Sequence, residues 1–199
     1  MNRSGLVVEQ TMKSDSVNGK VIMKYKGSLA RGDMPENIGG PVSMLIDLKK
    51  QNVAVLLHEQ KMTMTMTFEA QKKLVQRLVK EGGVDLKKVA KPKSTGKKEK
   101  VGAWEAEIFE TMVGKEKVRL WVVKDFPNYR SINARMAKFE TDGSFDPNQF
   151  ELGGLVVKSE FNVPPMGETS ITLLRVREES VDDAEFKIPA DYRDTDAGE

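Results

Sequence analysis

Apolar and polar residues alternate along most of this 199-residue chain. Successive side chains of a β-strand point to opposite faces of a sheet, so a period of two predicts strands with one buried face. Early in the chain the alternation occurs in residues 5–13, 19–27, 41–49 and 52–60. The break at residues 33–40 contains a proline and two glycines, which end a strand ladder. Strand centres about ten residues apart predict an antiparallel meander.

Two later segments have the period of a helix instead. Residues 68–83 and 128–143 carry apolar side chains at helical spacing, and glycines end both segments. The apolar stripes consist of Leu74, Val75, Leu78 and Val79 in the first segment and of Ile132, Met136 and Phe139 in the second. Strand-like alternation resumes in residues 103–112, 116–124, 154–163 and 168–178.

These elements predict an α+β fold of about ten strands and two helices. We expect a strongly curved antiparallel sheet, an incomplete β-barrel, with two or more helices packed over its concave face. The length and an apolar content of 39% indicate a single domain over residues 1–199. The last residues, 193–199, are polar and acidic, and we expect a disordered tail there.

The chain has no cysteine and a single histidine, His58. The lack of cysteine excludes thiol catalysis, thiolate metal sites and disulfides. Ser–His catalysis needs a base held by a third group, and no such partner adjoins His58, which we interpret as a surface residue at a hairpin turn. We therefore expect no enzyme, no catalytic residue and no cofactor.

The net charge of +2 combines a lysine-rich segment, residues 87–100, with an acidic C-terminus. Aromatic residues are not interleaved with the lysines, so nucleic-acid binding is not predicted. We interpret residues Lys87–Lys100 as a solvated loop, with peripheral contact to an anionic membrane as its alternative role.

The segment 61-KMTMTMTF-68 has an unusual choice of strand residues. On a strand, Met62, Met64, Met66 and Phe68 share one face, while the threonines form an outer face that tolerates water. Three interpretations of the methionines stay open. They pack in a core, they line a cavity for a hydrophobic ligand, or their thioethers bind Cu(I) through Met62, Met64 and Met66.

Two blocks of the sequence resemble a known family. Residues 100–125 join a Lys-x-Gly turn, an alternating strand, a gap with a glycine, and a strand with tryptophan that ends at Lys-Asp. Residues 183–192 contain the pattern Phe-x-Ile-Pro-x-x-Tyr. Both resemble the bacterial family named domain of unknown function 4412, and the resemblance runs from about Leu6 to Arg193.

The resemblance implies a periplasmic or otherwise extracytoplasmic protein, although the first residues lack the apolar region of a signal peptide. The family is similar in plan to periplasmic lipoprotein carriers of the LolA, LolB and LppX type, in which a curved sheet holds helices over an apolar cavity.

The implied function is that of a non-enzymatic binding protein, which receives a hydrophobic ligand, a lipid or a lipidated partner in a half-barrel. The expected lining consists of Met44, Met62, Met64, Met66, Phe68, Trp104 and Ile108. The alternatives are an envelope protein–protein interaction or assembly module with a packed core, and a Cu(I)-binding protein.

Overall fold

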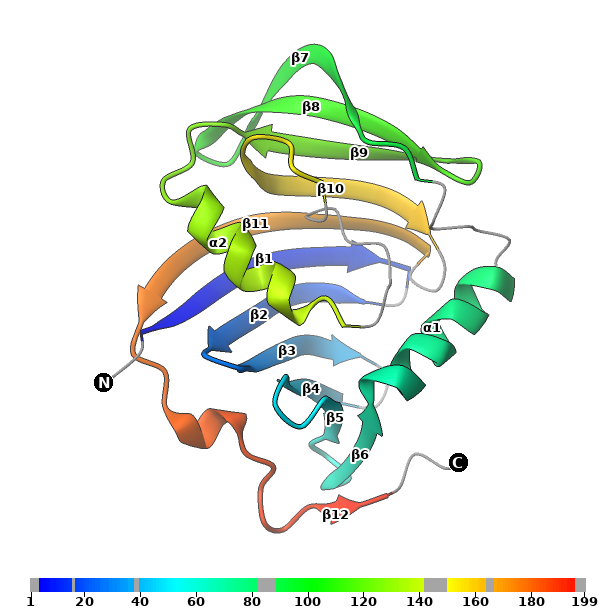
Figure 1. Cartoon of the computed structure of the whole chain (residues 1–199), viewed down its shortest axis with the longest axis vertical. Coiled ribbons are helices and arrows are strands. Elements are labelled where there is room, and N and C mark those ends of the chain that lie inside the picture. Colours follow the sequence, from blue (N-terminus) through cyan, green and yellow to red (C-terminus); the bar gives the residue numbers. More distant parts are fainter. Residues whose placement is uncertain are drawn as a thin grey trace.

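The computed structural model describes residues 4–15, 17–37, 40–81, 89–141, 150–163 and 167–195. Within these ranges the chain forms a twelve-stranded sheet and two α-helices (Figure 1). The first strands are β1 (Gly5–Ser14), β2 (Asn18–Lys26), β3 (Leu29–Asn37), β4 (Gly40–Asp47), β5 (Asn52–Leu57) and β6 (Met62–Thr67). The later strands are β7 (Lys93–Val101), β8 (Trp104–Val113), β9 (Glu116–Val123), β10 (Leu155–Val163), β11 (Gly167–Glu179) and β12 (Arg193–Asp194). The helices are α1 (Phe68–Glu81), α2 (Tyr129–Met136) and the short 3₁₀ helices η2 (Ala137–Phe139) and η4 (Asp183–Phe186).

The strand order is β12-β6-β5-β4-β3-β2-β1-β11-β10-β9-β8-β7. Most neighbours in the sheet are also neighbours in sequence, as expected for a meander, and β1 joins the two halves by pairing with β11. All pairs are antiparallel except β12 with β6, which is parallel. The mostly-β, α+β prediction is therefore confirmed, with a mixed rather than purely antiparallel sheet.

The predicted strong curvature is wrong. The sheet is not strongly curled. It is also open, because its two ends do not pair with each other. At one end β6 pairs with β12, and at the other end β7 pairs only with β8. Closure into a barrel requires the two edge strands to hydrogen-bond to each other.

One face of the sheet carries the main core. A register row runs across six strands, in which each residue lies directly opposite the next: Leu6, Tyr25, Ala30, Ile46, Val53 and Met66. Opposed residues point to the same face. Ile132 of α2 and Phe139 of η2 pack into the same core, and the Phe139 ring lies 5.4 Å from the ring of Tyr25. The side chains of this row therefore point to the face of the sheet that α2 covers.

A second cluster lies on the opposite face at the β8–β10 end. Phe109 belongs to this cluster, whereas its chain neighbour Ile108 belongs to the main core. Consecutive strand residues point to opposite faces, so the two clusters lie on the two sides of the sheet. Leu152 covers this second cluster, with Val89 and Phe150 packed against it.

The C-terminal segment Val181–Thr195, which we call the strap, covers the opposite face at the β1–β6 end. Val181 and Phe186 pack with Val7, and Tyr192 packs on a cluster of buried residues. That cluster consists of Leu45, Ala54 and Leu56. Arg193 and Asp194 then form β12 beside β6, and the backbone N–H of Thr195 donates to the Thr63 carbonyl at 2.8 Å. Residues 193–195, expected to belong to a disordered tail, therefore lie beside β6. Residues 196–199 lie outside the described residues.

Three other sequence expectations need correction. Residues 33–37 belong to β3, because Pro35 is accommodated next to a register irregularity between Met34 and Asn37. Lys93–Val101, expected as a loop, is edge strand β7, with a bulge between Ser94 and Lys98 and a positive φ at Gly96. Helix α2 is eight residues long and ends earlier than expected, and Gly82, Gly83 and Gly143 lie outside the described residues.

The strap anchor gives a stability prediction. Phe186 is 9% exposed, whereas Ile188, two residues away in the same segment, is 40% exposed. Phe186→Ala should lower the free energy of unfolding by about 3–5 kcal/mol, because it removes a buried ring. Ile188→Ala is the matched control and should change it by about 0.5 kcal/mol or less. Urea unfolding measures both; equal losses would show that the strap is not anchored through Phe186.

A pH prediction follows from Glu9 on β1. Lys20, at 2.5 Å, and Arg177 bind its carboxylate, and these hydrogen bonds lower the pKa of Glu9 below its ordinary value of 4.5. The unfolded state then binds more protons, so the stabilisation is present above pH 4.5 and is lost as the pH falls through the lowered pKa. Glu9→Gln should destabilise the protein at neutral pH, and the difference from the natural protein should shrink on acidification.

Glu168→Gln is the control for this prediction, because Glu168 is exposed and forms no ion pair among the described residues. Thermal unfolding at a series of pH values gives the comparison. A Glu9→Gln deficit that stays constant down to acidic pH would contradict the assigned ion pairs.

Candidate functional site

A surface of half-buried apolar side chains lies on β2–β6, on the same face as the main core. One register row contains Met23, Gly32, Met44, Val55 and Met64, each directly opposite the next. The following row contains Met34, Val42, Leu57 and Met62. Apart from Gly32, which is buried, every residue of both rows is half-buried. We call Met23, Met34, Met44, Met62 and Met64 the methionine surface.

The position of the helices explains this exposure. Figure 1 shows α2 crossing β11, β1 and β2 without crossing β4–β6. Ile46 and Val53, in the row that belongs to the main core, are 5% and 1% exposed. Met44 and Val55, one row further along the same strands and on the same face, are half-buried. The face therefore changes from core to partly open within two residues of each strand.

Gly32 lets the methionine side chains lie across β3. A Cβ at this position would come within 2.7 Å of Sδ and 3.3 Å of Cε of Met23, and within 3.5 Å of Cε of Met34. Both thioethers therefore occupy the space above the glycine, where a side chain would displace them. Glycine is needed at this position because the methionine side chains come close to the backbone. Its conformational freedom is not the reason, since Gly32 has no positive φ.

The seven expected lining residues fall into two groups. Met44, Met62 and Met64 belong to the methionine surface, and Met66 and Phe68 lie at its border, packed against the main core. Trp104 and Ile108 lie on β8, with six strands between β4 and β8. Ile108 is 7% exposed, and the Trp104 ring packs 5.5 Å from that of Phe126. The structure therefore does not place Trp104 and Ile108 beside the methionines.

The threonine side of β6 is less solvated than expected. Thr63 is 1% exposed, because β12 pairs with this strand and Thr195 donates two hydrogen bonds to the Thr63 carbonyl. Thr67 is exposed and caps α1 by accepting a hydrogen bond from the backbone N–H of Ala70 at 3.2 Å. The strap, which the alternation of residues did not predict, accounts for the difference.

His58 belongs to a polar network rather than to an open surface. Its Nδ1 lies 2.6 Å from the Tyr192 hydroxyl, and its Nε2 lies 2.7 Å from Ser43 Oγ. Ser43 Oγ donates to Asp33 at 2.7 Å and accepts from Arg31 at 3.1 Å. Because Ser43 has one proton and gives it to Asp33, His58 donates from Nε2 to Ser43 Oγ.

This network does not form a nucleophile. Ser43 is 2% exposed and lies on β4, and its proton points to Asp33 instead of to His58. A serine nucleophile needs access to a substrate and a base that takes its proton. His58 lies in the β5–β6 hairpin turn, as expected, but it is half-buried and bound to Tyr192, a contact that the sequence does not show.

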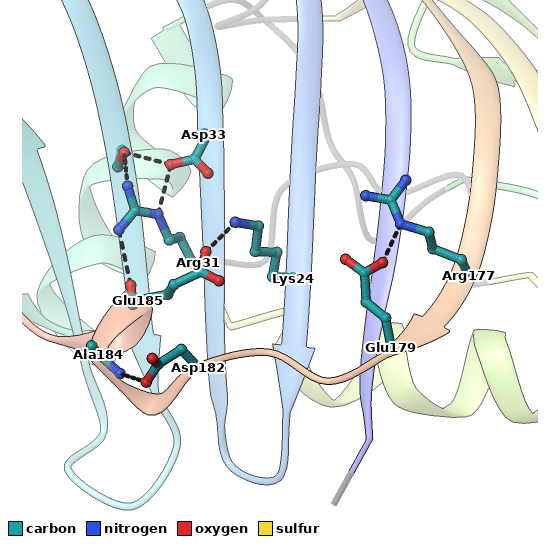
Figure 2. Close-up of polar contacts among 9 residues, drawn as sticks. Lys24, Arg31, Asp33, Arg177, Glu179, Asp182, Ala184 and Glu185 are labelled. Carbon is teal, nitrogen blue, oxygen red and sulfur yellow. Dashed lines mark hydrogen bonds and ion pairs between the residues drawn. The ribbon is translucent and has the colours of Figure 1, made fainter.

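The same network continues onto the strap, as Figure 2 shows. Arg31 donates to the Glu185 carbonyl at 2.9 Å, and the Glu185 carboxylate pairs with Lys24. Lys26 lies 2.7 Å from Asp183 and lowers the pKa of that carboxyl. These contacts come from β2 and β3 and hold η4 on the sheet. We infer that the network is a structural latch.

A separate cavity of about 830 Å³ lies away from the methionine surface. Its lining is polar and comes from β1, β2 and β8–β11, with Lys13, Asp15, Arg119, Glu160 and Glu168 among its residues. Arg119 and Glu160 pair across it at 2.6 Å. This mixed charge does not match the apolar cavity expected from the sequence.

The described residues also bear on metal binding and on membrane crossing. No group of three or more His, Cys, Asp or Glu side chains in them could hold a metal ion. None of their helices has the length and apolar character needed to cross a membrane.

Comparison with known proteins gives limited structural similarity. A search among curated proteins found no match. Two crystal forms of PNGF-II match 97% and 98% of this chain at 11% and 12% identity, with TM-scores of 0.45 and 0.44. The chain spans about a third of PNGF-II, 31% and 32% of its length.

The LolA superfamily protein NE2245 from Nitrosomonas europaea matches 94% of this chain and 90% of its own length, at 13% identity and a TM-score of 0.35. Neither similarity carries an argument about function.

The family comparison is more extensive. A family model described as Domain of unknown function (DUF4412) matches residues 5–192. The match begins with β1 and ends at Tyr192, so it includes the whole sheet except β12 and most of the strap. The chain therefore belongs to the DUF4412 family.

Proposed function

We propose that this protein is a non-enzymatic binding protein that acts outside the cytoplasm and holds a lipid acyl chain on its methionine surface. The location is part of the proposal and is supported by the family resemblance. The non-enzymatic character is supported by the buried Ser43 and its hydrogen bond to Asp33.

The half-buried register rows carry the proposal. Soluble proteins rarely leave large contiguous apolar areas exposed, and those that they do expose often mark a binding site. Methionine is unbranched and polarisable, so it adapts to ligands of varied shape better than Val or Ile. The neighbouring row of the same face packs fully with Ile46 and Val53. The methionines therefore lie along the border of the core, where Met23 and Met44 pack against it and stay half-buried.

The length of the row fits one acyl chain. From Met23 on β2 to Met64 on β6 there are four strand spacings, roughly 19 Å in total. The acyl chains of one bilayer leaflet span roughly 15 Å, half of the hydrocarbon core. A chain laid across the strands would contact Met23, Met44 and Met64 in turn.

The geometry favours an acyl chain over Cu(I). Three thioethers must converge on one ion to form such a site. Met66 packs against the main core, whereas Met62 and Met64 lie in the two open rows. An assembly module with a fully packed interior would not need the half-buried rows.

Replacing two methionines gives the test. Met44→Gln/Met64→Gln keeps side-chain length but places amides in the middle of the row. Each change should weaken binding of a fluorescent long-chain fatty acid by about tenfold, because burying one such side chain contributes about 1.5 kcal/mol. Fluorescence titration measures the dissociation constant.

Met112→Gln is the control, since Met112 on β8 is 47% exposed and lies outside the methionine surface. Its dissociation constant should equal that of the natural protein. If the natural protein does not bind the fatty acid, or if the double variant binds it equally well, the proposal is wrong.

A further inference from the structure

Helix α1 begins at the C-terminal end of β6, next to Met66 of the main-core row. It begins at Phe68, the residue after β6, and the backbone N–H of Phe68 donates to the Gln51 carbonyl at 3.0 Å. In Figure 1 the helix extends from the end of β6 along the side of the sheet. Met64 and Met62 lie four and six residues before the start of this helix, on the same strand.

The helix buries little of its apolar stripe. Val79 is its one buried residue, Val75 and Leu78 are half-buried, and Leu74 is 38% exposed. Helix α2, by comparison, inserts Ile132 into the main core although it is shorter. Packing on the sheet therefore does not account for the apolar side of α1 as a whole.

The opposite flank of α1 is basic. Lys72, Lys73, Arg77 and Lys80 are all exposed. Spacings of four and three residues make Lys73, Arg77 and Lys80 neighbours on the helix surface, whereas Lys72 lies further round the helix. Lys73 pairs with Glu69 at 3.0 Å. Within the described part of the chain Lys72, Arg77 and Lys80 form no ion pair. The helix thus combines basic side chains that have no ion-pair partner among the described residues with a partly exposed apolar edge.

The lysines of β7 are arranged differently. Lys93, Lys98 and Lys100 lie directly opposite glutamates of β8, namely Glu110, Glu107 and Glu105. Lys98 binds Glu105 at 3.1 Å, and this contact raises the pKa of Lys98. Lysines along an edge strand also discourage pairing with other chains. The charge of β7 is therefore largely used within the sheet, although this segment was the membrane contact expected from the sequence.

We propose that α1 docks the protein on an anionic phospholipid bilayer, with Lys72, Arg77 and Lys80 at the headgroups and Leu74 at the acyl boundary. Basic residues at a surface are attracted to anionic lipid, and the apolar side of an amphipathic helix enters the interface. The inference rests on the proposed function, since a phospholipid bilayer is a source of acyl chains.

Vesicle sedimentation tests the inference. The natural protein should bind phosphatidylglycerol-containing vesicles, should not bind pure phosphatidylcholine vesicles, and should dissociate at high salt. Lys72→Gln/Arg77→Gln/Lys80→Gln should weaken binding on the order of 100-fold, about fivefold for each removed charge. These residues are exposed and glutamine is a good helix former, so the fold should be retained.

Lys97→Gln/Lys98→Gln/Lys100→Gln on β7 is the matched control, because it removes the same charge at the other end of the sheet. It should change vesicle binding by less than threefold. If it weakens binding as much as the α1 variant, or if the α1 variant binds normally, the docking surface is not α1. A natural protein that does not sediment with anionic vesicles also overturns the inference.

Titration with the fluorescent fatty acid, without vesicles, separates the two proposals. The α1 variant should bind the fatty acid normally. Normal fatty-acid binding without vesicle binding overturns the docking inference alone. Vesicle binding without fatty-acid binding overturns the proposed function and leaves the docking surface on α1 supported.

Discussion

The extent of helix cover is the constraint on which the rest of this structure depends. Helix α2 has eight residues and is therefore roughly 12 Å long, whereas β2–β6 alone span roughly 19 Å. Ile132 and Phe139 close the row that contains Tyr25 and Ile46, and the next rows are only half-covered. The same strand thus contributes Val53 to the core and Val55 to a partly open surface. Methionine at these positions keeps the face apolar and adaptable without demanding a fixed partner.

The opposite face of the same strands is closed by the strap. Phe186 and Tyr192 are its apolar anchors, while Lys24, Lys26 and Arg31 hold backbone and carboxylate groups of residues 181–185, before Phe186. This explains the Phe-x-Ile-Pro-x-x-Tyr pattern: two aromatic residues pack, the isoleucine is largely exposed, and the Pro189 carbonyl accepts the backbone N–H of Tyr192. One side of the β1–β6 half is therefore sealed by its own chain, and the methionine side is the face on which we propose that the acyl chain binds.

Local periodicity predicted most strands and both helices, because alternation and helical spacing depend on neighbouring residues. It missed β3, where Pro35 indicated a break. It also missed β7, whose lysines are all exposed and so show no buried face, and β12, whose two residues are defined by their partner β6. For the site, the shared face of Met62 and Met64 followed from the strand period alone. The distance from Trp104 to these residues, and the contact between His58 and Tyr192, depend on strand order and on the path of the strap. Neither leaves a signal in a short stretch of sequence.

Methyl NMR of protein labelled with ¹³C at the methionine methyl groups tests the central claim most directly, since it observes the proposed contact atoms themselves. On addition of a long-chain fatty acid, the account predicts shifts for the methyl signals of Met23, Met44 and Met64 and none for Met112. Unchanged signals for those three residues at saturating fatty acid would contradict it.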